Sequence, residues 1–139
     1  MVILDTNVLS ALMHRPADER VTEWLDTQPT LSVWTTSVTV FEIRVGLEAL
    51  APGRRRRSLE AEFERVLNDD IEGRILPFDT DAATAAAILA AARQRAGRPG
   101  ELRDTMIAGI VLASHATFAT RNTRHFADLT VPVIDPWQG

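Results

Sequence analysis

Cysteine, lysine and tyrosine are all missing from this sequence of 139 residues. Without cysteine the chain can form no disulfide, thiolate nucleophile or cysteine-based zinc site. No apolar run approaches the roughly 20 residues that a membrane span requires. The N-terminus also lacks the basic segment and cleavage site of a signal peptide. We therefore expect a soluble, cytoplasmic protein.

Because lysine is missing, arginine carries all of the positive side-chain charge. The formal net charge is −4, which argues against a broad positive field that would hold nucleic acid nonspecifically. Arginine can contact phosphate or carboxylate through two nitrogens at once. A genome rich in arginine and alanine codons would explain the same excess, so arginine usage alone decides nothing.

Hydrophobic residues make up 45% of the chain and charged residues 24%, an ordinary globular composition. With no repeat and no linker, we expect one domain over residues 1–139. Short apolar runs alternate with helix-like segments, which predicts a parallel sheet of about five short strands with helices on both faces. The expected strands are residues 2–4, 31–36, 74–78, 117–120 and 131–134. The expected helices are residues 7–13, about 19–27 with Asp18 as its cap, 38–50, about 58–67, 81–96 and 103–114.

Three local features sharpen this α/β prediction. Pro77 limits the third strand to an end or an edge of the sheet. Ser37 is a plausible N-cap for the helix over 38–50. In open α/β sheets, ligands bind outside the carboxyl ends of the strands, where the strand order reverses. Asp5, directly after the first strand, therefore stands where such a fold places its site.

Three of the acidic residues stand apart from the solvated helix faces. Asp5 closes the first strand, Glu42 lies in the apolar helix start SVTVFEIRVG, and Asp104 opens a helix after a Gly/Pro loop. Each has a purely structural alternative. Asp5 could cap the first helix, Glu42 could pair with Arg44 or lie on the outer face, and Asp104 could complement a helix dipole.

Taken together, the three acids indicate a metal site. Carboxylates gathered at one sheet edge repel one another, and a bound cation relieves that repulsion. Oxygen ligands without His or Cys suit Mg²⁺ or Mn²⁺, and the matching chemistry is phosphodiester hydrolysis. The segment after the TFAT strand should emerge at the same edge. There Thr120 and Asn122 could steady a carboxylate or a metal-bound water, and Arg121 or Arg124 could meet phosphate.

Four motifs, LDTNVLS, SVTVFEIRVGL, GRPGELRDTMIAG and FATRNTRHFADL, resemble in order and spacing those of PIN-domain ribonucleases. The likeness spans nearly the whole chain. Within that family the sequence looks like the VapC and FitB type, the toxin half of bacterial toxin–antitoxin pairs. The resemblance implies a Rossmann-like α/β/α sandwich and an RNA-cleaving enzyme that uses Mg²⁺, with Mn²⁺ as a possible substitute.

The resemblance also implies roles for individual residues. The acids at Asp5, Glu42 and Asp104 would form the metal site, with Asp5 and Asp104 as the surest ligands. Asn122 stands where some members carry a fourth acid, which implies one firmly held metal and a second recruited with substrate. His125 or Asp128 could compensate. Groups orienting the ligands would be Thr6, Asn7 and Thr120.

Partners follow from the same resemblance. The family suggests a homodimer and a small VapB- or FitA-like antitoxin that lays its C-terminal segment across the site. The assembly would be a heterotetramer or larger, and DNA would be bound only through the antitoxin. An acidic pocket would attract an arginine from another chain, which fits such a partner.

Two rival functions remain open. One is an aspartyl phosphatase with Asp5 as nucleophile, although Asn7 replaces the expected second aspartate and the expected lysine is missing. The other is a PIN-like scaffold or regulator that has lost activity, which Asn122 supports. Outside the site, Arg54–Arg57 could touch RNA or be a solvated helix start. The remaining side chains singled out are expected to be structural: Trp24, Trp34 and Trp137 in core or interface, His14 and His115, and Asp79 and Asp81 as helix caps.

Overall fold

A computed structural model describes all residues from Met1 to Gly139 and contains a parallel five-stranded sheet in the order β3-β2-β1-β4-β5. Val2 pairs with Val33 on one side and with Thr117 on the other, so β1 lies at the centre. β3 is an edge strand, as the proline after it predicts. The strands are β1 Val2–Leu4, β2 Val33–Thr36, β3 Ile75–Leu76, β4 Thr117–Ala119 and β5 Val133–Ile134.

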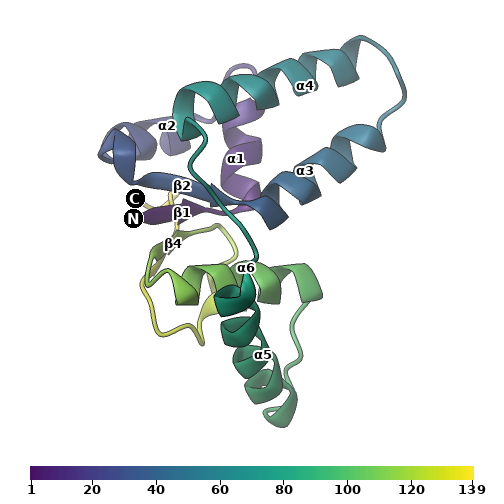
Figure 1. The fold of residues 1–139 in the computed structure, drawn as a ribbon. Helices are drawn as coiled ribbons and strands as arrows, with labels where there is room; N and C mark the ends of the chain where they lie inside the picture. Colours follow the sequence, from purple (N-terminus) through teal and green to yellow (C-terminus); the bar gives the residue numbers. More distant parts are fainter.

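Helices cover both faces of the sheet, so the α/β prediction is confirmed. α1 to α4 lie on one face, α5 and α6 lie on the other, and the two termini are close together (Figure 1). None of the helices is long and apolar enough to cross a membrane. The six helices are α1 Thr6–Met13, α2 Glu19–Asp26, α3 Ser37–Glu48, α4 Arg54–Arg65, α5 Thr80–Arg95 and α6 Leu102–Ala113. Single turns are η1 Thr30–Ser32, η2 Val66–Ile71 and η3 Thr123–Phe126.

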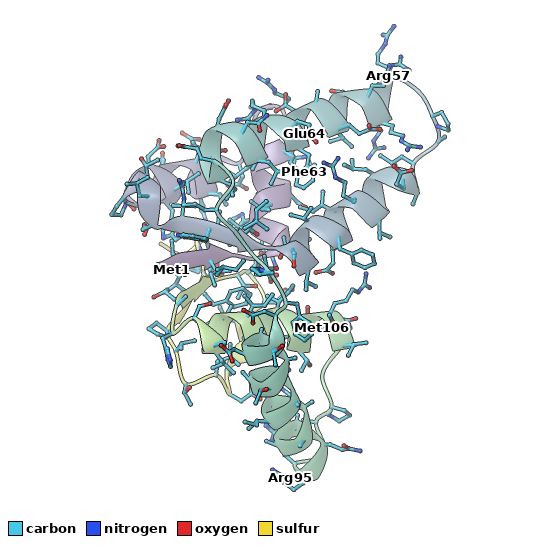
Figure 2. The ribbon with its side chains drawn as sticks, viewed as in Figure 1. Met1, Arg57, Phe63, Glu64, Arg95 and Met106 are labelled. Carbon is cyan, nitrogen blue, oxygen red and sulfur yellow. The ribbon has the colours of Figure 1, made fainter.

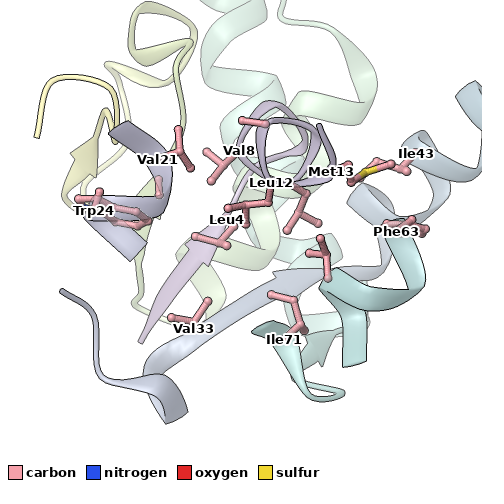
Figure 3. Packing of buried hydrophobic residues seen from close by; sticks show 14 of the residues in the cluster. Leu4, Val8, Leu12, Met13, Val21, Trp24, Val33, Ile43, Phe63 and Ile71 are labelled. Atoms are coloured by element: carbon pink, nitrogen blue, oxygen red, sulfur yellow. The ribbon is translucent and has the colours of Figure 1, made fainter. Parts of the chain in front are cut away.

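The alternation of β1 side chains divides the interior into two apolar clusters, one on each face. Val2 and Leu4 point into the larger cluster and Ile3 into the smaller. Figure 3 shows the larger cluster, where Val8 and Leu12 of α1 pack over Leu4. The smaller cluster is built from β4, α6 and part of α5. Two cores on one short sheet hold its carboxyl edge from both sides.

Several element boundaries differ from expectation. Thr36, and not Ser37, is the N-cap of α3, because the Thr36 hydroxyl accepts the backbone N–H of Thr39 at 3.0 Å. The second strand begins at Val33, since a 3-10 turn occupies the two residues before it. The expected fourth helix begins earlier, at Arg54, and continues beyond Arg65 into the π-helical turn η2.

The Ala-rich helix α5 is explained by its contact with α6. A Cβ atom placed on Gly109 of α6 would lie 2.5 Å from the Ala82 carbonyl and 2.6 Å from the Ala86 Cβ. Only small residues allow the two backbones to approach this closely. Asp79 caps α5 by accepting the Ala82 N–H at 2.9 Å, as expected. Asp81 lies in the first turn.

Candidate metal and nuclease site

The candidate site lies where the chain reverses its direction of travel across the sheet. From β1 the chain moves outward to β2 and β3, then returns to place β4 on the other side of β1. Asp5 and Thr120 follow β1 and β4, so both stand at the carboxyl edge of this switch point. The backbone N–H of Asp5 donates to the Ala119 carbonyl at 2.9 Å, which fixes the two strand ends together.

Asp5 is the most deeply held acid of the site, with 4% of its surface exposed. Its Oδ1 accepts the backbone N–H of Thr6 at 2.8 Å, so Asp5 also caps α1. Its Oδ2 accepts the Thr120 hydroxyl at 2.7 Å and the Asn7 amide at 3.4 Å. Burial raises the pKa of Asp5 from the ordinary 3.8 to about 6, against the opposing effect of these hydrogen bonds. The capping and site interpretations of Asp5 are therefore compatible.

Glu42 reaches the same edge from α3 and is held by α1. Its Oε1 accepts the Thr6 hydroxyl at 2.9 Å, and its Oε2 lies 3.9 Å from the Arg103 guanidinium. Pairing of Glu42 with Arg44 is wrong: Arg44 instead contacts Glu64 of α4 at 2.6 Å. The Arg44 guanidinium also lies 4.9 Å from the centre of the Phe63 ring. Figure 2 labels its two partners, Phe63 and Glu64.

Asp104 is the third acid and lies in the first turn of α6. Its backbone N–H donates to the Glu101 carboxylate at 2.9 Å, and Glu101 is the N-cap of that helix. Its Oδ2 lies 3.7 Å from Nδ1 of His125. Partial burial, with the nearby charge of Glu101, raises the pKa of Asp104 above its ordinary range.

The donor chemistry of these three acids suits a hard divalent cation. The negative charges of Asp104 and Glu42 add to the raised pKa of Asp5, so the three carboxylates interact electrostatically. They do not form a closed cage, however, since no three acidic or histidine side chains converge closely enough to enclose an ion alone. Mg²⁺ commonly uses one or two carboxylates and completes its shell with water. The residues present fit that mode of binding.

In the segment after β4, the side chain of Asn122 is free, whereas that of Arg121 contacts another part of the chain. Asn122 is exposed, its side-chain amide makes no hydrogen bond, and its backbone N–H donates to the Thr120 hydroxyl at 3.1 Å. The Arg121 guanidinium lies 4.6 Å from the centre of the Trp137 ring, and its backbone N–H donates to Asn7 at 3.1 Å. The charged end of Arg121 is therefore turned toward Trp137.

Sequence reasoning missed Arg93, a nearly buried residue at the C-terminal end of α5. Its guanidinium contacts both carboxylate oxygens of Asp128 at 2.8 and 2.9 Å. It also donates to the Thr105 hydroxyl at 3.3 Å and to the His125 carbonyl at 3.0 Å. Asp128 is consequently occupied by Arg93 and is not free to replace a fourth acid. Nothing in the Ala-rich pattern around Arg93 indicates this role.

The chain belongs to the PIN domain family, whose model matches residues 2–131. Among its relatives, Toxin FitB of Neisseria gonorrhoeae is 34% identical over 99% of both chains. VapC ribonuclease Y4jK of Sinorhizobium fredii is 35% identical, again over 99% of both. The crystal structure of FitAcB from Neisseria gonorrhoeae superposes with a TM-score of 0.88 at 33% identity over the full length of both chains.

Proposed function

We propose that the protein is a metal-dependent endoribonuclease and the toxin of a VapBC-like toxin–antitoxin pair. The observation that carries this proposal is Asp5, a buried carboxylate at the topological switch point whose pKa is raised to about 6. Keeping such a group without a cation is unfavourable above that pH. The relatives of this chain include a protein named as a VapC ribonuclease and one named as a toxin.

In this proposal Asp5 and Asp104 hold Mg²⁺ or Mn²⁺, and Glu42 contributes directly or through water. When bound, the cation supplies polarisation of water and neutralisation of charge at the scissile phosphate. Thr6 and Thr120 fix the orientation of Glu42 and Asp5 by donating their hydroxyl groups. Exposed Asn122 at the rim offers an amide to substrate or to a second ion, in agreement with one firmly held metal.

We further propose a homodimer that binds a VapB- or FitA-like antitoxin, with DNA contacted only through that partner. A related solved structure is described as FitAB bound to a DNA fragment, 34% identical with a TM-score of 0.87. In this chain a mainly apolar groove of about 280 Å³ runs between α1, α3 and α4 and reaches Glu42. An apolar partner segment ending in arginine would match that groove and the acidic edge beside it.

Cleavage mapping tests the enzymatic part of the proposal. Total RNA would be incubated with wild-type protein, Asp5→Asn and the control Asp69→Asn, and the new 5′ ends sequenced. Asp69 is an exposed acid of η2, beside the opposite sheet edge near Val33. We expect specific ends with wild type and the control, and none with Asp5→Asn. Cleavage by Asp5→Asn at the wild-type rate would exclude the metal mechanism, and turnover of aryl phosphate alone would favour a phosphatase.

The partner part has its own test. The product of a small open reading frame adjacent to this gene would be co-expressed and the complex mass measured by light scattering. We expect a stable complex containing two copies of this chain and loss of nuclease activity within it. Full activity in the presence of that product, or a monomeric chain, would contradict this part alone.

A further inference from the structure

A hollow lined mainly by charged and polar residues lies beside Asp104 and extends beyond the three acids of the metal site. It has a volume of about 370 Å³, and of the ten residues that line it only one is hydrophobic. Its walls come from the segment that joins α5 to α6 and from η3. Figure 1 shows this segment returning from the far tip of α5 toward the start of α6. We call this hollow the α5–α6 pocket.

The α5–α6 pocket is a built structure rather than a gap between mobile side chains. Arg93 is 5% exposed and ties together Thr105 of α6, the His125 carbonyl of η3 and Asp128. Gly100 allows the connecting segment to pass close to it, because a Cβ there would lie 2.7 Å from Nη1 of Arg93. A single buried guanidinium therefore sets the distance between the two walls.

Two arginines at the pocket, Arg98 and Arg124, are exposed and take part in no ion pair. Arg93 is already neutralised by Asp128, and Glu101 is engaged by the Asp104 N–H and by Arg103. The wall cations that make no ion pair are thus Arg98, whose charge helps to lower the pKa of Asp128, and Arg124. An exposed guanidinium offers two parallel donors to a phosphate and a flat face on which a base can stack.

We propose that the α5–α6 pocket binds one nucleotide of the RNA strand next to the scissile phosphate, with Arg98 and Arg124 contacting its phosphate or base. This rests on the proposed nuclease function. The volume is in the range of small-ligand pockets, roughly 300 Å³ and above, and the polar lining suits a sugar-phosphate. Because Asp104 and His125 line it, a strand whose phosphate lies at the metal ligands continues into it. The pocket would therefore help to choose the cleavage position.

The test compares Arg98→Gln and Arg124→Gln with Arg95→Gln. Arg95 has the same charge and lies at the nearby tip of α5, as Figure 2 shows, but it does not line the pocket. Binding of a fluorescein-labelled, mixed-sequence oligoribonucleotide would be followed by anisotropy in Mg²⁺ across a salt series. Each pocket variant should weaken binding about tenfold and reduce the salt slope by about 0.7 per lost phosphate contact. Arg95→Gln should change affinity by less than about twofold.

Two further readouts separate a contact from a structural effect. Arg124→Lys keeps the charge but loses the paired donors of the guanidinium. It should therefore retain the wild-type salt slope but recover only part of the affinity that Arg124→Gln loses. Sequencing of cleavage ends should show altered position preference in the pocket variants and not in Arg95→Gln. Because all three arginines are exposed, thermal melting should be unchanged.

The outcomes distinguish this inference from the proposed function. If wild type cleaves RNA and both pocket variants keep wild-type affinity, salt slope and cleavage positions, the pocket proposal is overturned. If wild type binds but does not cleave, and binding still depends on Arg98 and Arg124, hydrolysis fails and the pocket stands. Absence of RNA binding, or an effect of the variants on antitoxin binding alone, also overturns the pocket proposal.

Discussion

The two halves of the candidate metal site are built in different ways. Asp5 is 4% exposed and is held by Thr6, Asn7 and Thr120 at the ends of two paired central strands. Asp104 is partly exposed, and its carboxylate contacts only His125, at 3.7 Å. The strand half is pre-organised by the sheet, whereas the α6 half depends on Arg93, one helix turn and a connecting segment. On the proposed function, we expect binding of a cation to adjust the α6 half and to leave the strand half in place.

Removing Arg93 should have the largest effect on stability. Arg93→Met takes away the pairing with Asp128 and the contacts with Thr105 and His125, so the free energy of unfolding should fall by about 3 kcal/mol. Urea denaturation measures this, with Arg95→Met as the matched control at within about 0.5 kcal/mol of wild type. Equal stabilities of the two variants would show that Arg93 does not hold the α6 half.

The buried Asp5 predicts an unusual pH dependence of stability without metal. Its folded pKa of about 6 exceeds the ordinary 3.8, so protonated Asp5 stabilises the fold at low pH. That contribution is lost as pH rises through about 6, and the raised pKa corresponds to at most about 3 kcal/mol. In EDTA, the stability of wild type relative to Asp5→Asn should therefore fall between about pH 4 and about pH 7.

Mg²⁺ should reverse this loss, because a cation favours the ionised carboxylate. Wild type should gain more thermal stability from Mg²⁺ than Asp5→Asn or Asp104→Asn, while Asp69→Asn should match wild type. If the stabilities of wild type and Asp5→Asn in EDTA changed with pH in parallel, Asp5 would titrate normally. Its ionised form would then not destabilise the metal-free fold.

The acids of both halves, Asp5 and Asp104, were named from sequence, whereas the arginine that holds the α6 half was not. A three-residue apolar run before Asp5 predicts a buried parallel strand from local sequence alone, and parallel sheets place their sites at the carboxyl ends of such strands. Thr36 replaced Ser37 as the cap of α3 because two neighbouring hydroxyls satisfy the same pattern equally well. The role of Arg93 could not be predicted because its partners, Thr105 and Asp128, are distant in the sequence.

Thr120→Val tests the pre-organisation of the strand half more finely. The valine keeps the shape but cannot donate to Asp5, so metal affinity should fall about tenfold to a hundredfold. Thr35→Val is the control, since Thr35 is an equally buried strand threonine whose hydroxyl donates to the Leu4 carbonyl instead. Calorimetric titration with Mn²⁺ compares the metal affinities of the two variants. Equal affinities would show that the Thr120 hydroxyl does not contribute to metal binding.

The smallest effect is expected at Glu42, whose support comes from one hydroxyl. Thr6→Val removes the 2.9 Å hydrogen bond to Glu42 but keeps the backbone contact to Asp5, so cleavage should slow about threefold. Thr22→Val on α2 removes a hydroxyl contact away from the site and should leave the rate unchanged. If Mn²⁺ titration of Thr6→Val showed a loss of metal affinity as large as that of Thr120→Val, Glu42 would belong among the direct metal ligands.

The most direct measurement is anomalous scattering from crystals soaked in Mn²⁺. We predict one strong peak between the carboxylates of Asp5 and Asp104, with Asp104 moved toward Asp5 and the Thr120 contact of Asp5 unchanged. Well-ordered crystals with no peak at this edge, or with Mn²⁺ bound only elsewhere, would contradict the assignment of this edge as a metal site.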